Sequence, residues 1–284
     1  MDYRKAFRVE PGSKLNLGKL DPAYHGKHES EEMAAKELAD YGEKLFKQQS
    51  LLYAEHKHSV LVVLQALDAA GKDGTIKHCF TVLNPQGVSV VGFKQPTPEE
   101  LAHDFLWRIH PHAPGKGAIS IFNRSHYEDV LVTRVHKLID KATWTERYKR
   151  IRDFEALLSG NGTTIVKFFL HISKEEQLAR FAQRLDDPRR NWKISESDYS
   201  ERELWDKYIA AFEDVIGATT TRDAPWYVIP ANHKWFRNLA VSQIMADTME
   251  DLKLAYPKPT VDLDDIRRKY HAAAAEEKVN KKKD

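Results

Sequence analysis

Five short apolar runs, separated by longer amphipathic stretches, constrain the fold of this chain more than any other feature. The first run, SVLVVL at residues 59–64, is continuous and β-branched, as in a strand that is buried on both faces. The other runs occupy residues 88–93, 118–122, 164–170 and 226–229. Apolar residues at helical spacing predict helices over residues 29–54, 74–83, 98–110, 127–158 in two pieces, 174–185, 198–216 and 234–255. This alternation predicts an α/β fold of three layers, in which helices cover both faces of a parallel five-stranded sheet.

The segments outside this pattern divide the chain into three parts. Residues 1–28 are polar and weakly periodic, and we predict an N-terminal arm there. Residues 29–256 contain all the predicted strands and the helices that alternate with them, and form one domain. Within it, residues 186–197 (DDPRRNWKISES) are polar and basic and predict a mobile loop. Residues 257–284 are a charged tail that ends in KVNKKKD, for which we expect a helix and a frayed end.

The charge balance and the cysteine content limit the class of protein. With 44 basic and 42 acidic residues, the formal net charge is only +2, so an anion site must come from local clusters of Lys and Arg. The single cysteine, Cys79, excludes an intrachain disulfide and favours a packing role in a reducing compartment. The N-terminus is charged where a signal peptide is apolar, and no apolar run approaches the roughly 18 residues of a membrane span. We therefore expect a cytoplasmic protein without membrane contact.

A glycine-containing loop follows the first apolar run and precedes a helix. It reads ALDAAGKDGT from Ala66 to Thr75 and has the position of a phosphate-binding loop (P-loop), in which backbone N–H groups at a helix N-terminus surround phosphate oxygens. Ala66 replaces the first glycine of that motif, and Asp73 replaces its Ser or Thr. The alternative is a flexible turn that contains a lysine by coincidence. As a P-loop, it would bind phosphate through Ala70, Gly71, Lys72, Asp73 and Gly74.

Asp68 is unusual, because a carboxylate inside such a loop repels phosphate unless a cation lies between them. Mg²⁺ prefers hard oxygen ligands and bridges carboxylates to phosphates. Asp68 is therefore a candidate metal ligand. The alternative is a side chain that stabilises the turn.

Polar residues also follow the third apolar run. Arg124 is expected at the carboxyl end of its strand, where a guanidinium can bind phosphate oxygens in a fork. Two carboxylates, Glu128 and Asp129, come about one helical turn later, and a carboxylate near this edge often helps P-loop proteins to hold a metal. Taken without context, both could instead be acidic residues that favour a helix N-terminus.

Taken together, these segments resemble the family-2 polyphosphate kinases. The resemblance lies in FNRSHYEDVLVTRVH (122–136), LDAAGKDGTIKH (67–78), NPQG (84–87), FKQPTPEELAHDFLWR (93–108), RLDDPRRNWKIS (184–195) and APWYVIPANHKWFRNL (224–239). It extends over about residues 30–256, with all motifs in the same order. The third-strand motif contains Tyr-Glu-Asp, and in this it resembles the motif of the class III branch, whose members phosphorylate both nucleoside mono- and diphosphates.

The resemblance implies a role for each matched position. Asp68 and Asp129 would hold Mg²⁺, for which Mn²⁺ could substitute, and Lys72 and Arg124 would bind the phosphates that are exchanged. These four side chains form the expected catalytic set, and Glu128 would influence acceptor choice. The implied partners are polyphosphate and the nucleotides ADP, AMP and ATP, without nucleic acid. The implied assembly is a homo-oligomer (dimer or tetramer).

A basic cluster lies at about residues 180–200, where the resemblance implies a helical lid. Its members are Arg180, Arg184, Arg189, Arg190 and Lys193. Because Arg180 and Arg184 share one helix face, a solvated surface is the alternative. In the family that the chain resembles, this segment closes over phosphates and excludes water, which favours transfer over hydrolysis. We expect polyphosphate contacts from Arg180, Arg184, Arg189 and Lys193.

The sequence thus predicts a reversible, Mg²⁺-dependent kinase that transfers a phosphoryl group from inorganic polyphosphate to ADP or AMP. The terminal phosphate oxygen of the acceptor attacks directly, so no covalent nucleophile of the protein is required. One alternative is an ATP-dependent nucleoside monophosphate kinase of the same architecture. Another is a non-catalytic protein that binds polyphosphate or nucleic acid through the basic cluster and the Lys-rich tail.

Overall fold

The computed structural model describes residues 1–28 and 30–280. Glu29, where the predicted domain begins, and residues 281–284, which hold the lysines at the end of the tail, lie outside the described residues. The centre of the molecule is a parallel sheet with the strand order β2-β3-β1-β4-β5. The strands are β1 (Ser59–Ala66), β2 (Val88–Gly92), β3 (Ile119–Asn123), β4 (Thr163–His171) and β5 (Trp226–Pro230). Each strand contains one of the five apolar runs, so the predicted parallel five-stranded sheet is confirmed.

The position of β1 explains where the loops of the sheet converge. β1 lies between β3 and β4, and Val60 is paired with both Ile119 and Thr164. From β1 the chain runs to β2 and β3 on one side of β1, and then crosses to β4 and β5 on the other. Such a reversal of strand order opens a crevice at the carboxyl ends of the strands. The loops that follow β1 and β3 border this crevice.

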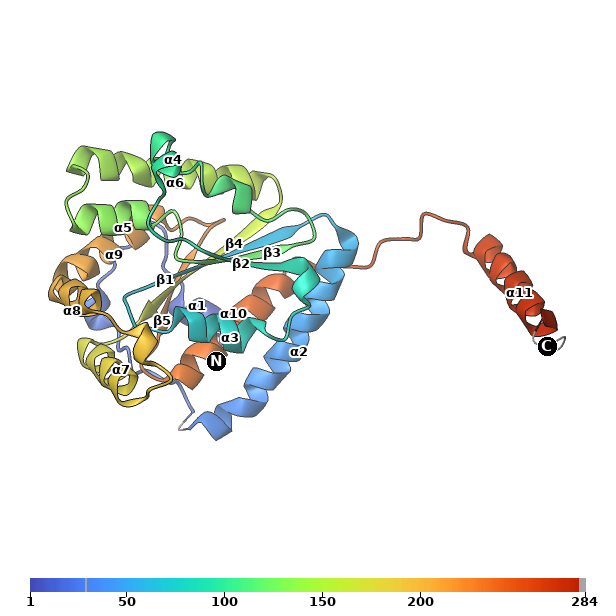
Figure 1. Ribbon diagram of the computed structural model, residues 1–284, viewed down its shortest axis with the longest axis horizontal. Helices are drawn as coiled ribbons and strands as arrows, with labels where there is room; N and C mark the ends of the chain where they lie inside the picture. Colours follow the sequence, from blue (N-terminus) through green and yellow to red (C-terminus); the bar gives the residue numbers. More distant parts are fainter. Residues whose placement is uncertain (29, 281–284) are drawn as a thin grey trace.

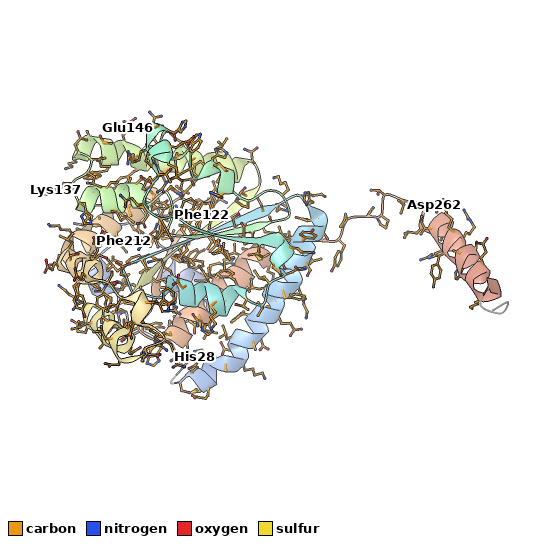
Figure 2. All side chains as sticks on the ribbon, in the orientation of Figure 1. His28, Phe122, Lys137, Glu146, Phe212 and Asp262 are labelled. Atoms are coloured by element: carbon orange, nitrogen blue, oxygen red, sulfur yellow. The ribbon has the colours of Figure 1, made fainter. Side chains whose placement is uncertain are left out.

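Helices cover both faces of the sheet (Figure 1). One face is packed by α2 (Glu31–Glu55), α3 (Lys72–Phe80) and α10 (Lys234–Glu250), and the other by α5 (Glu128–Val135), α6 (Lys141–Gly160) and α9 (Trp205–Thr219). Figure 2 shows that Phe122 and Phe212 lie inside the molecule, whereas Lys137 and Glu146 lie at its edge. The three predicted layers are therefore present.

Two predicted helices differ in extent from the observed ones. The helix predicted over residues 98–110 was wrong beyond Ala102, where α4 (Pro98–Ala102) ends. The Asp104 carboxylate accepts a hydrogen bond from the backbone N–H of Leu106 at 3.0 Å, and this local turn replaces the helix. The helix predicted over 198–216 is divided at Leu204 into α8 (Glu196–Glu203) and α9. The segment before α8, which follows α7 (Lys174–Asp186), contains a short 3-10 turn, Asn191–Lys193.

The two ends of the chain are placed differently. The N-terminal segment begins with α1 (Tyr3–Phe7) and packs on the body, because the N–H of Tyr3 donates to Gln243 Oε1 at 2.7 Å and the N–H of Val9 donates to the Trp226 carbonyl at 2.9 Å. The tail contains α11 (Leu263–Asn280), which projects away from the body on an extended linker (Figure 1). Among the described residues, no helix combines the length and the apolar character that crossing a membrane requires.

Candidate active site

The loop between β1 and α3 has the backbone conformation that a phosphate-binding loop requires. Gly71 caps α3 with φ of 107°, a left-handed conformation that glycine adopts readily. A Cβ atom on Gly71 would lie 1.9 Å from Nη1 of Arg237, and one on Gly74 would lie 3.1 Å from Nη2. Gly71 therefore has no room for a side chain beside Arg237, and Gly74 has little. The free N–H groups at the start of α3 and the positive end of its dipole form a site for an anion.

Lys72 is the first residue of α3, and its ammonium lies at this loop. Its Nζ donates a hydrogen bond to the carbonyl of Ala66 at 3.0 Å. Burial lowers the pKa of Lys72, and the nearby Asp68 carboxylate opposes that effect. A partly desolvated ammonium without a salt bridge among the described residues can bind a phosphate oxygen strongly.

Side chains of the loop after β3 contact side chains of the loop after β1. Arg124 has φ of 62°, and its Nη2 lies 3.3 Å from Oδ1 of Asp68. The amide of Asn123 donates to Oδ1 of Asp73 at 2.8 Å. The predicted phosphate-binding arginine and the predicted metal-binding aspartate are therefore neighbours.

A cavity of about 1010 Å³ lies over the P-loop; we call it the larger cavity. The site residues predicted from the sequence that line this cavity are Asp68, Gly71, Lys72, Asp73, Gly74, Arg124, Arg180, Arg184 and Lys193. Further basic residues on its wall are Lys94, Arg190, Lys234 and Arg237. The wall also carries Glu31 and Glu176, but Lys and Arg predominate. The local cluster of positive charge expected from the near-neutral composition is present here.

A second cavity of about 400 Å³ adjoins the larger one, and Asp68 and Arg124 line both. Glu128 lines only the second cavity. Its apolar wall comes from α5 and α9 and consists of Leu131, Val132, Trp205, Tyr208 and Phe212. Burial raises the pKa of Glu128, and the charges of Arg124 and Lys72 oppose this shift. This carboxyl group therefore lies within the field of the two predicted phosphate-binding cations.

Asp129, the other predicted metal ligand, lines neither cavity. Its Oδ2 accepts a hydrogen bond from Nη2 of Arg108 at 3.4 Å, and its Oδ1 lies 3.9 Å from Nη1 of Arg147. Adjacent residues of a helix point about 100° apart, so Asp129 cannot share the direction of Glu128. The structure does not bring Asp129 to Asp68. Among the described residues, no group of three or more His, Cys, Asp or Glu side chains lies close enough to hold a metal.

The predicted lid residues lie in three different environments. Arg184 and Lys193 line the larger cavity, and Lys193 Nζ lies 4.0 Å from Asp73. Arg189 lines neither cavity and forms a salt bridge with Asp187 at 3.0 Å. Arg180 is buried beneath the loop, where its Nη1 donates to the carbonyls of Ala69 and Ala70, both at 2.9 Å. Arg180 is thus engaged with the loop backbone.

Ala70, another predicted phosphate contact, is fully buried, and its N–H donates to the Leu67 carbonyl at 3.3 Å. The structure therefore turns this N–H group away from the larger cavity.

Sequence reasoning missed the contribution of the segment after β5. Arg237 and its neighbours Asn232, His233, Lys234 and Asn238 line the larger cavity. The rule that ligands bind beyond the carboxyl ends of parallel strands applied equally to this fifth strand. Its apolar run ends at Ile229, so the residues that follow could have been predicted as binding residues from the sequence.

Known proteins with similar sequences include polyphosphate phosphotransferases, in agreement with these features of the site. The family model for polyphosphate kinase 2 (PPK2) matches residues 28–257. The chain is 52% identical over 256 residues to an AMP/ADP-polyphosphate phosphotransferase of Meiothermus ruber, covering 90% of this chain and 96% of the relative. It is 46% identical over 272 residues to an ADP-polyphosphate phosphotransferase of Rhodopseudomonas palustris, covering 90% and 93%.

Solved structures agree with the sequence comparisons. The crystal structure of polyphosphate kinase 2 from Arthrobacter aurescens TC1 superimposes with a TM-score of 0.92 at 40% identity, covering 96% of this chain and 97% of that one. The P-loop geometry, the basic cavity and the match over nearly the whole length lead to one assignment. This chain belongs to the polyphosphate kinase 2 family.

Proposed function

We propose that this enzyme transfers the terminal phosphoryl group of inorganic polyphosphate to ADP and to AMP. The observation that carries the proposal is that Asp68 and Arg124 line both cavities. Polyphosphate is a chain of negative charge without apolar surface, so the larger, basic cavity suits the donor. A nucleoside has apolar faces, so the second cavity with Trp205 and Phe212 suits the acceptor.

The reaction then takes place where the cavities meet. A terminal phosphate oxygen of ADP attacks the last phosphorus of the polyphosphate chain, and the bond between that phosphorus and the bridging oxygen breaks. The products are ATP and a polyphosphate shorter by one phosphate, and AMP gives ADP in the same way. Lys72, Arg124 and the N–H groups of the loop neutralise charge that spreads over the transferred group and the leaving oxygen. One anhydride bond replaces another, so the reaction runs readily in both directions.

A divalent cation, Mg²⁺ or Mn²⁺, belongs to this proposal. The residues present fit it, because Asp68 and Glu128 are hard-oxygen donors that line the same cavity beside Arg124. When bound, the cation would supply charge neutralisation for the phosphate oxygens. Asp68→Asn should abolish transfer and reduce Mg²⁺ binding measured by calorimetry. A variant that binds Mg²⁺ as the parent does would remove Asp68 from the metal site.

The assignment of the two cavities is testable by substitutions on each wall. Val132→Asp places a charge on the apolar wall of the second cavity, so the KM for ADP should rise while the KM for polyphosphate stays level. Arg184→Gln should do the reverse. If each variant changes both KM values equally, the cavities do not separate donor and acceptor.

The donor distinguishes this proposal from an ATP-dependent nucleoside monophosphate kinase. With AMP as the acceptor, ADP should form from polyphosphate in the absence of ATP. Formation of ADP only when ATP is supplied would favour the rival kinase. Binding of polyphosphate without turnover of AMP or ADP would favour the non-catalytic alternative.

We also propose that the enzyme is a homo-oligomer (dimer or tetramer). Leu263, Ile266 and Tyr270 share one face of α11 and are 45–68% exposed. A single helix of this length is marginal in water, so a second copy is expected to cover this face. Ile266→Glu with Tyr270→Glu should lower the mass measured by light scattering, whereas Arg268→Glu on the opposite face should not. An unchanged mass in the double variant would reject this role for α11. A cytoplasmic location and the absence of nucleic-acid binding stay predictions from the sequence.

A further inference from the structure

Arg237, on the first turn of α10, lies directly beneath the P-loop. Its side chain is 2% exposed. Nη1 donates a hydrogen bond to the carbonyl of Ala70 at 3.2 Å, and Nε and Nη2 donate to Oδ1 of Asn238 at 3.2 Å and 2.8 Å. The guanidinium occupies the space that side chains on Gly71 and Gly74 would need. The edge of this cation therefore faces the loop that we assign to phosphate.

The charge of Arg237 has no carboxylate partner among the described residues. Burial lowers the pKa of Arg237 to about 10; the nearby Cys79 side chain opposes this shift, and the second cation Arg180 adds to it. The group is therefore positively charged at neutral pH.

The other buried lysine and arginine side chains in the described part of the chain do have carboxylate partners. Arg108 pairs with Asp129, Lys167 with Glu155, and Arg180 with Glu176. A buried charge without a counter-ion costs stability, because it loses its hydration without compensation. Arg237 is the exception, and it lies at the wall of the larger cavity.

We infer that Arg237 is a positioning residue for the donor, and that the missing counter-ion is a phosphate of the polyphosphate chain bound over Gly71 and Gly74. This inference rests on the proposed function. Arg237 acts on the phosphate through the loop that it supports, and it lies too deep to replace Lys72 or Arg124 at the reacting atoms. It contributes to donor affinity and not to acceptor binding.

The two substitutions that test this role differ in charge. Arg237→Met keeps much of the apolar stem and removes the charge. Arg237→Lys keeps the charge but loses the planar guanidinium and its paired N–H donors. As a matched control, Arg108→Met removes a buried arginine that does have a carboxylate partner, which leaves Asp129 with only the more distant Arg147.

Two measurements are made on the full chain, namely the melting temperature with and without inorganic tripolyphosphate, and the KM values for polyphosphate and ADP. For Arg237→Met we expect a ligand-free melting temperature at or above that of the parent and a smaller increase than the parent shows on adding tripolyphosphate. Its KM for polyphosphate should rise by about tenfold or more, with the KM for ADP unchanged, because the positive charge beneath the phosphate-binding loop is lost. Arg237→Lys should be intermediate, and Arg108→Met should melt below the parent.

The inference is overturned if folded Arg237→Met keeps the parent's response to tripolyphosphate and its KM for polyphosphate. Equal increases in both KM values would also overturn it. If the Met variant does not fold, the same criteria apply to Arg237→Lys. If the parent uses ATP but not polyphosphate as donor, the proposed function has failed, and the KM for ATP then tests Arg237 by the same comparison.

Discussion

Glu128 and Asp129 are adjacent in the sequence, yet their carboxylates belong to different parts of the molecule. Glu128 lines the second cavity with Asp68 and Arg124, whereas Asp129 is held by Arg108 and Arg147. We propose that Glu128 acts on the acceptor, whereas Asp129 anchors the start of α5. Substituting each residue separates these roles.

Glu128→Gln keeps the shape of the side chain and removes its charge. AMP is one phosphate shorter than ADP, so it depends more on a cation or ordered water held by Glu128. Phosphorylation of AMP should therefore fall by about tenfold more than that of ADP, the effect of one lost electrostatic contact in a dry site. Equal losses with both acceptors would contradict a role in acceptor choice.

The neighbouring substitution Asp129→Asn serves as the control. It removes the nearer of the two carboxylates that face the buried Arg108, the other being Glu100 at 3.9 Å, and should lower the free energy of unfolding by about 2–3 kcal/mol. The ratio of AMP to ADP rates should stay near the parent value. A changed ratio with unchanged stability would reverse the two assignments.

The pH dependence of stability provides a second test of Glu128. Burial raises its pKa above the ordinary value of 4.5, so the folded chain holds the proton more tightly than the unfolded chain. Ionising Glu128 therefore reduces stability as the pH rises from about 4.5 through the folded pKa. The Glu128→Gln variant has no carboxyl group to ionise and does not lose this stability. As the pH rises over this range, its melting temperature should therefore increase relative to that of the parent. A difference that stays constant from pH 4 to 8 would show that burial does not perturb Glu128.

Lys72→Ala removes the ammonium from the P-loop. The fold should persist, because Lys72 forms one hydrogen bond to a loop carbonyl and no salt bridge among the described residues. The rate of transfer should fall by about three orders of magnitude, since a phosphate-facing charge is lost from a low-dielectric site. Circular dichroism checks the fold. A folded variant with near-parent turnover would remove the P-loop assignment.

Arg184 and Arg189 form a matched pair in the predicted lid. Only Arg184 lines the larger cavity, while Arg189 is 88% exposed and pairs with Asp187. Arg184→Gln should raise the KM for long polyphosphate and increase its dependence on salt, and Arg189→Gln should change neither quantity measurably. Equal effects of the two substitutions would show that the basic run acts as a whole and not through the cavity wall.

The fold was predictable because its signals are local. Each strand contains a continuous apolar run, and the glycine, lysine and strand-to-helix order of the P-loop lie within ten residues. Arg124 was predicted at the end of β3 from the same periodicity, and it does lie beside Asp68. The family resemblance added the lid and the chemistry.

Features that depend on side-chain direction or on distant partners were not predictable. The orientation of Glu128 relative to Asp129 depends on how α5 packs against α6 and α9. The burial of Arg180 depends on carbonyls of the P-loop and of Ala231 and Asn232, which are 51 to 111 residues away in the sequence. Arg237 lies under Gly71 only because α10 packs beside α3. These relationships arise from tertiary packing, which periodicity does not encode.

Polyphosphate is the phosphoryl donor that we propose for this enzyme. The most direct measurement is the initial rate of ATP formation from ADP, Mg²⁺ and long-chain polyphosphate, with ATP absent at the start and Lys72→Ala as the control. Luciferase luminescence measures the ATP, and gel electrophoresis measures the shortening of the chain. We expect ATP to accumulate in step with that shortening, and the control to form almost none. No ATP from polyphosphate, in a preparation that transfers phosphate from ATP to AMP, would contradict the account.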